Sequence, residues 1–163
     1  MKILYFGGQK SGKSSLAEAK TLAIATDQPT YLATYDHTYG DSEMGTRIDK
    51  HRQTRGENFI TLEESRDLLR VIEPHRTYLV DCVSMWILNR MEESEEVLIA
   101  EIEALGAIDA NIVFVLNDVG SGVIPSDPIS RRYVDLSGII GQALARICDE
   151  VYEVKLGLER RLK

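Results

Sequence analysis

Residues 7–14 constrain this chain more than any other stretch, because they match the full pattern G-x-x-x-x-G-K-S. They are Gly7, Gly8, Gln9, Lys10, Ser11, Gly12, Lys13 and Ser14. The pattern follows an apolar run, Lys2 to Phe6, that predicts a buried strand, and precedes residues 15–20, which predict a helix. We therefore predict a phosphate-binding loop. The alternative is a glycine-rich turn that only joins a strand to a helix.

The chemistry of such a loop follows from its backbone. Glycines let the chain curl until several N–H groups point into one hollow, and the N-terminus of the next helix adds partial positive charge. In this setting Lys13 is expected to meet the β- and γ-phosphates of a nucleoside triphosphate, and the hydroxyl of Ser14 is expected to bind Mg²⁺.

Composition narrows the class of protein. The chain has 163 residues, 44% of them hydrophobic, which suits one domain, residues 1–163, with a substantial core. Its net charge of −7 argues against general affinity for nucleic acid or an anionic membrane. Cys82 and Cys148 show no metal-ligand spacing. With no signal peptide and no run long enough to span a bilayer, we expect a cytoplasmic protein.

Apolar runs and helical stretches alternate along the chain. Strands are expected at Lys2–Phe6, Tyr31–Thr34, Asn58–Thr61, Tyr78–Cys82, Asn111–Leu116 and Val151–Leu156. Helices are expected at residues 15–20, from Asp41 or Ser42 to Arg55, and at 63–72, 84–91, 94–105 and 130–148. This order predicts an α/β fold of three layers, of the RecA-like P-loop NTPase type. A mostly parallel central sheet would carry helices on both faces.

Ligands of such sheets bind at the carboxyl ends of the strands. We therefore expect one shared ligand-binding opening at this edge of the sheet, formed by the loops after Phe6, Thr34, Cys82 and Leu116. Asp81 ends an apolar run, where an acid of many phosphate-loop proteins binds Mg²⁺. Its alternative role is to cap the next helix. Residues 118–128 form a long Gly- and Pro-containing loop at the same edge, and such loops are more often functional than decorative.

A second unusual stretch follows the second predicted strand. Glu43, Arg47, His51 and Arg55 recur every four residues, which places them on one stripe of a helix. The stripe has two interpretations. It is either an exposed helix with ion pairs, or an anion-binding face in which Arg47, Arg52 and Arg55 hold phosphates. In the second interpretation His51, mostly neutral at pH 7, would serve as a nucleophile or a proton carrier.

Several segments together resemble the bifunctional adenosylcobinamide kinase / adenosylcobinamide-phosphate guanylyltransferase family of cobalamin biosynthesis. The resemblance spans nearly the whole chain. It rests most specifically on an R-I-x-x-H-R segment, Arg47 to Arg52, joined in this order to a D-V-G-x-G-x-I-P segment, Asp118 to Pro125. The phosphate loop, residues 80–86 and the closing residues 157–163 add to it. Asp118 and Gly141 depart from the family pattern, which usually has Glu and Asn at these positions.

The resemblance implies two reactions. First, ATP or GTP gives its γ-phosphate to a hydroxyl of adenosylcobinamide. Second, a histidine attacks the α-phosphorus of GTP, and the guanylyl-histidine gives GMP to adenosylcobinamide phosphate. His51 stands at the family's histidine position. The resemblance also implies a homotrimer and a guanine-nucleotide site formed by Thr34, Tyr35, Asp36, Arg52, Gln53, Thr54, Arg55, Glu63 and Asp81.

Two other functions remain open on the residues alone. A small-molecule kinase of another pathway would share the phosphate loop and Asp81 but would not need a nucleophilic His51. A non-catalytic GTP-binding module would bind nucleotide without turning it over. All three readings include a bound nucleotide, so they are separated by what happens after binding.

Overall fold

The structure is a computed structural model, and it describes residues 1–36 and 56–163. The helix expected from Asp41 or Ser42 to Arg55 lies outside the described residues. So do the predicted site residues that it carries, namely His51, Arg52, Gln53, Thr54 and Arg55.

One sheet of seven strands organises the described residues, in the order β3-β2-β4-β5-β1-β6-β7. Every neighbouring pair is parallel except β6 and β7. The strands are β1 (Lys2–Gly7), β2 (Thr30–Ala33), β3 (Ile60–Glu63), β4 (Thr77–Asp81), β5 (Asn111–Asn117), β6 (Glu150–Lys155) and β7 (Leu158–Arg161). β1, the strand that precedes the phosphate loop, therefore lies inside the sheet, between β5 and β6.

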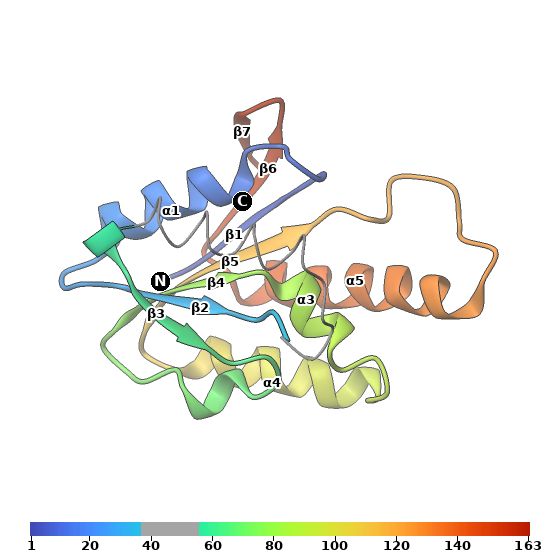
Figure 1. Cartoon of the computed structure of the whole chain (residues 1–163), viewed down its shortest axis with the longest axis horizontal. Helices are drawn as coiled ribbons and strands as arrows, with labels where there is room; N and C mark the ends of the chain where they lie inside the picture. The colour runs from blue at the N-terminus through green and yellow to red at the C-terminus, as the bar shows by residue number, and fades with distance from the viewer. Residues whose placement is uncertain (37–55) are drawn as a thin grey trace.

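Helices cover both faces of this sheet, as Figure 1 shows. Helix α1 (Lys13–Ile24) packs on one face, against β1, β4 and β5. Helices α3 (Val83–Leu88), α4 (Glu95–Ala107) and α5 (Pro128–Ile147) lie on the other face. The predicted three-layer α/β fold with a mostly parallel sheet is confirmed.

Successive side chains of a strand point to opposite faces of the sheet, which explains why two cores form. In β5, Ile112 and Phe114 point into the core beneath α3, α4 and α5, whereas Val113 and Val115 point into the core beneath α1. All four side chains are fully buried. A strand with both faces covered must be apolar on both, which is why β5 reads as a continuous hydrophobic run.

The start of α5 shows how local chemistry sets an element boundary. The carboxylate of Asp127 accepts a hydrogen bond from the backbone N–H of Ser130 (2.9 Å), and Pro128 occupies the first turn. An acidic cap followed by proline satisfies one orphan N–H and removes another. The helix therefore begins two residues before the predicted start at Ser130.

Residues 63–72 do not form the predicted helix. Strand β3 continues through Glu63, and only a short 3-10 turn, Leu68–Arg70, follows it. The apolar spacing of Leu68 and Ile72 reflects burial under α4 rather than a helical face, since both side chains are buried in that core. A second difference is β7, which was not predicted because its residues, Leu158–Arg161, are exposed throughout.

Candidate nucleotide-binding site

The phosphate loop joins β1 to α1, so the predicted strand–loop–helix setting is confirmed. Gly12 stands at the N-cap of α1 with φ of 98°, a conformation that favours glycine, and the helix begins at Lys13. Within the loop, the backbone N–H of Ser11 donates to the carbonyl of Gly8 (3.2 Å). The N-terminus of a helix of 12 residues thus opens directly onto the loop, as an anion site requires.

Lys13 is drawn into the loop rather than out to solvent. Its ammonium group donates to the carbonyl of Gly8 (3.1 Å), and the residue is only 6% exposed. Burial lowers the pKa of Lys13, while the nearby charge of Asp81 acts in the opposite direction. A partly desolvated ammonium group gains more from an incoming phosphate than an exposed one does, because charge interactions strengthen as water is excluded.

The loop rests against the turn between β6 and β7. The backbone N–H of Gly157 in that turn donates to the carbonyl of Ser11 (2.8 Å). A Cβ atom on Gly7 would come within 2.3 Å of the carbonyl oxygen of Val154, and one on Gly12 within 3.1 Å of the Cα atom of Gly157. Two of the loop's glycines are therefore required by packing on this hairpin as well as by backbone curvature.

Asp81 lies at the end of β4, and β5 separates that strand from β1. The phenolic hydroxyl of Tyr31 donates to Oδ2 of Asp81 (2.9 Å). Tyr31 is buried and Asp81 is half-buried, so this bond is partly shielded from bulk water. The predicted alternative role, capping of α3, is not what the structure shows, since the N-cap of α3 is Cys82 and has no side-chain cap.

A hydroxyl at Ser14 and a carboxylate at Asp81 are the donor types that Mg²⁺ prefers. Ser14 is the second residue of α1, and both side chains are half-buried. Among residues 1–36 and 56–163, no three His, Cys, Asp or Glu side chains gather into a metal site. These residues fit a magnesium ion that shares its coordination with water and nucleotide phosphates, as Mg²⁺ in phosphate-transfer sites usually does.

The residues predicted for the guanine nucleotide lie along the same edge of the sheet. In the strand register, Ala33 pairs with Glu63 on one side and with Asp81 on the other. Thr34, Tyr35 and Asp36 follow Ala33 directly. Thr34 is buried, Tyr35 and Asp36 are half-buried, and Glu63 is exposed. The structure therefore brings these predicted residues to neighbouring strand ends.

The end of β2 and the phosphate loop share this edge but stand apart on it. Three steps between neighbouring strands separate β2 from β1. At about 4.8 Å a step, that distance is roughly 14 Å. The edge thus has a phosphate end at β1 and a second end at β2 and β3, with Asp81 between them.

The long loop after β5 also reaches the phosphate loop. The backbone N–H of Asp118 donates to the carbonyl of Gly7 (2.9 Å), and the Asp118 carboxylate accepts from the N–H of Gly120 (3.2 Å) and from Oγ of Ser121 (2.6 Å). Further along the loop, Val123 and Ile124 are exposed. The predicted closeness of this segment to the phosphate loop is confirmed at its first residue.

Sequence reasoning missed three groups that hold this edge together. Oγ of Ser84 accepts from the backbone N–H of Asn117 (2.8 Å), and the carbonyl of Ser84 accepts from Oη of Tyr133 (3.2 Å). The side-chain amide of Asn89 donates to the carbonyl of Thr34, which follows β2, and to the carbonyl of Ser65, which follows β3. No pattern in the sequence signals these roles, because each depends on contacts between residues far apart in the chain.

The fold and this site define a nucleotide-binding α/β protein of the phosphate-loop class. The chain belongs to the cobinamide kinase / cobinamide phosphate guanyltransferase family, whose model matches residues 3–162. No helix in the described parts of the chain is long and apolar enough to cross a membrane.

Relatives of known name match the chain over its full length. The bifunctional adenosylcobalamin biosynthesis protein CobP of Pseudomonas aeruginosa is 38% identical over 175 residues, which cover 100% of this chain and 98% of the relative. The protein CobU of Escherichia coli, of the same description, is 33% identical over 185 residues, covering 100% of both chains. A solved type III secretion ATPase matches 98% of this chain and 56% of its own, at 14% identity and a TM-score of 0.46, too distant to bear on function.

Proposed function

We propose that this chain carries out both reactions of its family. It phosphorylates adenosylcobinamide with ATP or GTP, and it transfers GMP from GTP to adenosylcobinamide phosphate through a guanylyl-histidine. The observation that carries the proposal is the phosphate loop, formed at the same sheet edge as Thr34, Glu63 and Asp81 in a chain of this family.

In the kinase reaction, the loop N–H groups and Lys13 neutralise charge that spreads over the phosphate oxygens during transfer. The hydroxyl oxygen of the acceptor forms a bond to the γ-phosphorus, the bond between that phosphorus and the β–γ bridging oxygen breaks, and the nucleoside diphosphate leaves. When bound, Mg²⁺ would be held by Ser14 and Asp81 and would supply further positive charge to the phosphates.

In the guanylyl reaction, a ring nitrogen of His51 forms a bond to the α-phosphorus of GTP, and the bond from that phosphorus to the pyrophosphate oxygen breaks. A phosphate oxygen of adenosylcobinamide phosphate then displaces the imidazole and takes the GMP. Splitting one transfer into two easier steps is the general advantage of a covalent intermediate. Thr34, Tyr35, Asp36, Arg52, Gln53, Thr54, Arg55, Glu63 and Asp81 are proposed to hold the guanine nucleotide.

The test is transfer of label to the protein from GTP labelled at the α-phosphate, followed by addition of adenosylcobinamide phosphate. The wild type should hold the label through an acid-labile bond and release it as adenosylcobinamide-GDP. His51→Ala should lose labelling and keep at least part of the kinase rate. Lys13→Ala should lose about 10²–10³-fold in both rates, since its charge serves both phosphoryl groups.

His75→Ala is the matched control, because His75 is an exposed histidine whose imidazole pairs with Asp109 (3.2 Å). It should label like the wild type. Two outcomes would contradict the proposal. Phosphorylation of an acceptor without any labelled protein would indicate a kinase alone, and GTP binding without transfer would indicate a binding module.

Four further properties belong to this proposal. We propose that residues 1–163 act as one catalytic domain and that the protein assembles as a homotrimer, which sedimentation would test. The free thiols of Cys82 and Cys148 suit a reducing compartment, so we propose a cytoplasmic protein. Its substrates are small molecules rather than nucleic acid, in agreement with its acidic charge.

A further inference from the structure

The ends of β2 and β4 are joined by the side chain of Thr34. Its hydroxyl donates to the carbonyl of Cys82 (2.7 Å) and accepts from the backbone N–H of Cys82 (3.1 Å). Thr34 is fully buried. Because Cys82 follows Asp81, and Tyr35 follows Thr34, this pair of bonds fixes two peptides from which predicted nucleotide ligands project.

Thr34 is in turn held by Asn89, which follows α3. The amide nitrogen of Asn89 donates to the carbonyl of Thr34 (2.8 Å) and to the carbonyl of Ser65 (2.9 Å). An amide NH₂ group has two donor hydrogens, so one side chain satisfies both carbonyls. Asn89 is 5% exposed, and it therefore links the segments that follow β2 and β3 in a nearly dry environment.

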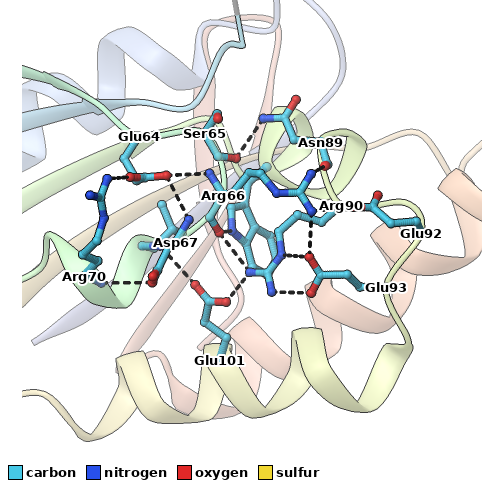
Figure 2. A network of polar contacts seen from close by, with 12 residues as sticks. Glu64, Ser65, Arg66, Asp67, Arg70, Asn89, Arg90, Glu92, Glu93 and Glu101 are labelled. Atoms are coloured by element: carbon cyan, nitrogen blue, oxygen red, sulfur yellow. Dashed lines mark hydrogen bonds and ion pairs between the residues drawn. The ribbon is translucent and has the colours of Figure 1, made fainter.

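The base of this link is an ionic network, which Figure 2 shows around Asn89. Arg90 and Glu101 are nearly buried in it, whereas Arg66 is exposed. The Arg66 guanidinium donates to the carbonyl of Asn89 and to Glu93 (3.1 Å). The neighbouring Arg90 donates to Glu93 (2.8 and 2.5 Å), to Glu101 and to the carbonyl of Arg66 (3.0 Å).

Trp86 completes the base. Its indole N–H donates to the same Arg66 carbonyl (2.8 Å), and its ring lies 4.8 Å from the Arg90 guanidinium. The network thus holds the backbone carbonyl of Asn89, through Arg66, and the side chain of the next residue, Arg90. The hydrogen bonds of this network join residues 66–101, whereas the phosphate loop joins β1 to α1.

We propose that Asn89 is a positioning residue for the guanylyl-transfer half of this site. Its amide holds the Thr34 carbonyl, and through Thr34 the Cys82 peptide, in the orientation that the guanine-nucleotide residues need. The inference rests on the proposed function. In this role Asn89 acts through Thr34, whose carbonyl it holds. The kinase half depends chiefly on the loop between β1 and α1, so it should depend less on Asn89.

The test compares Asn89→Ala and Asn89→Asp with Trp86→Phe. Both Asn89 variants remove the donors to Thr34 and Ser65, and the aspartate keeps the shape while placing a carboxylate against two carbonyl oxygens. Trp86→Phe removes a donor from the same network without touching Thr34, so it controls for loss of stability alone. If Asn89→Asp does not fold, Asn89→Ala still carries the comparison.

Two rates and one structural readout are measured. In Asn89→Ala, the single-turnover rate of protein guanylylation at saturating GTP should fall at least tenfold more than the rate of phosphorylation of adenosylcobinamide. In Trp86→Phe, the two rates should change in equal proportion. Hydrogen exchange of the backbone amides of residues 33–36 should accelerate at least tenfold in Asn89→Ala relative to Trp86→Phe.

Equal loss of both rates in Asn89→Ala, or the same ratio in Trp86→Phe, would overturn the positioning role. A wild type that never becomes guanylylated would instead overturn the proposed function. In that case the exchange readout still decides whether Asn89 holds the end of β2, since it needs no turnover.

Discussion

At the scale of single residues, hydrogen bonds with neighbouring groups hold the two charged side chains of the site, Lys13 and Asp81. The ammonium group of Lys13 donates to a carbonyl of its own loop, and Asp81 accepts a bond from the hydroxyl of the buried residue Tyr31. The G-x-x-x-x-G-K-S pattern predicts Lys13 because the backbone geometry of the loop is local. Tyr31 could not be predicted in the same way, since it lies 50 positions from Asp81 and meets it only because β2 and β4 are neighbours.

Tyr31→Phe removes only the hydroxyl that orients Asp81. The loss of about 1 kcal/mol from one hydrogen bond should raise the Mg²⁺ concentration for half-maximal phosphorylation by about fivefold. It should weaken the binding of Mn²⁺ to the protein–GDP complex, followed by electron paramagnetic resonance, by the same factor.

Tyr78→Phe provides the control on the neighbouring strand. Tyr78 is also a buried residue, but its hydroxyl accepts from the backbone N–H of Glu73 (2.9 Å) instead of donating to Asp81. A metal requirement that shifts equally in both variants would show that Tyr31 does not act through the carboxylate.

At the scale of elements, the hydrophobic pattern predicted the strands β1, β2, β4, β5 and β6 and the helices on both faces. The same pattern gave a wrong prediction where buried residues of an irregular segment happen to have the spacing of a helix. Leu68 and Ile72 are spaced four apart, as on a helix, but they are buried from an irregular segment beneath α4. Strand β7 escaped prediction because an exposed strand, with all four residues open to solvent, carries no hydrophobic alternation.

The contact between the phosphate loop and the β6–β7 hairpin predicts that alanine is damaging at Gly7 but tolerated at the adjacent Gly8. In Gly7→Ala, the new Cβ atom meets the carbonyl oxygen of Val154, which is backbone and cannot rotate away. We expect a loss of about 1–3 kcal/mol of stability from this overpacking, together with weaker GTP binding as the loop shifts.

Gly8→Ala is the matched control, since a Cβ atom on Gly8 has nothing within 4 Å. Thermal unfolding and binding of a fluorescent GTP analogue would measure both effects. If Gly8→Ala is as damaging as Gly7→Ala, the loop requires glycine because of its backbone curvature and not because of its contact with β6.

At the scale of the whole molecule, the partly buried ionic network ties α3, α4 and the segment after β3 to one another. Glu93 accepts bonds from Arg90 and Arg66, and Glu101 accepts from Arg90 and from the backbone N–H of Leu68 (3.1 Å). Breaking one partner of a buried ion pair leaves the other uncompensated. The network should therefore contribute to global stability as well as to the site.

The hydrogen bonds from Arg90, and the charge of Arg66, lower the pKa of Glu93 below its ordinary value of 4.5, although burial acts in the opposite direction. A carboxyl group whose pKa is lower in the folded state stabilises that state fully above its unfolded pKa and less as pH falls through the folded pKa. Glu93→Gln should thus cost about 1–3 kcal/mol at pH 7, and less as pH falls below 4.5.

Urea unfolding of Glu93→Gln and the wild type across this pH range gives the difference directly. Glu103→Gln, at an exposed position of α4, serves as the control and should change little at any pH. A cost for Glu93→Gln that does not vary with pH would contradict the role assigned to its charge.

The position of β1 inside the sheet has a consequence for synthesis of the protein. β1 is translated before the other strands of the sheet, yet its two partner strands are residues 111–117 and 150–155, and the turn that supports its loop contains Gly157. On the ribosome, the phosphate loop of a nascent chain thus lacks its contacts with β5, β6 and the β6–β7 turn until residues 111–157 have emerged. Cellular GTP and ATP would then favour the native state only after translation has passed this point, and not during early folding.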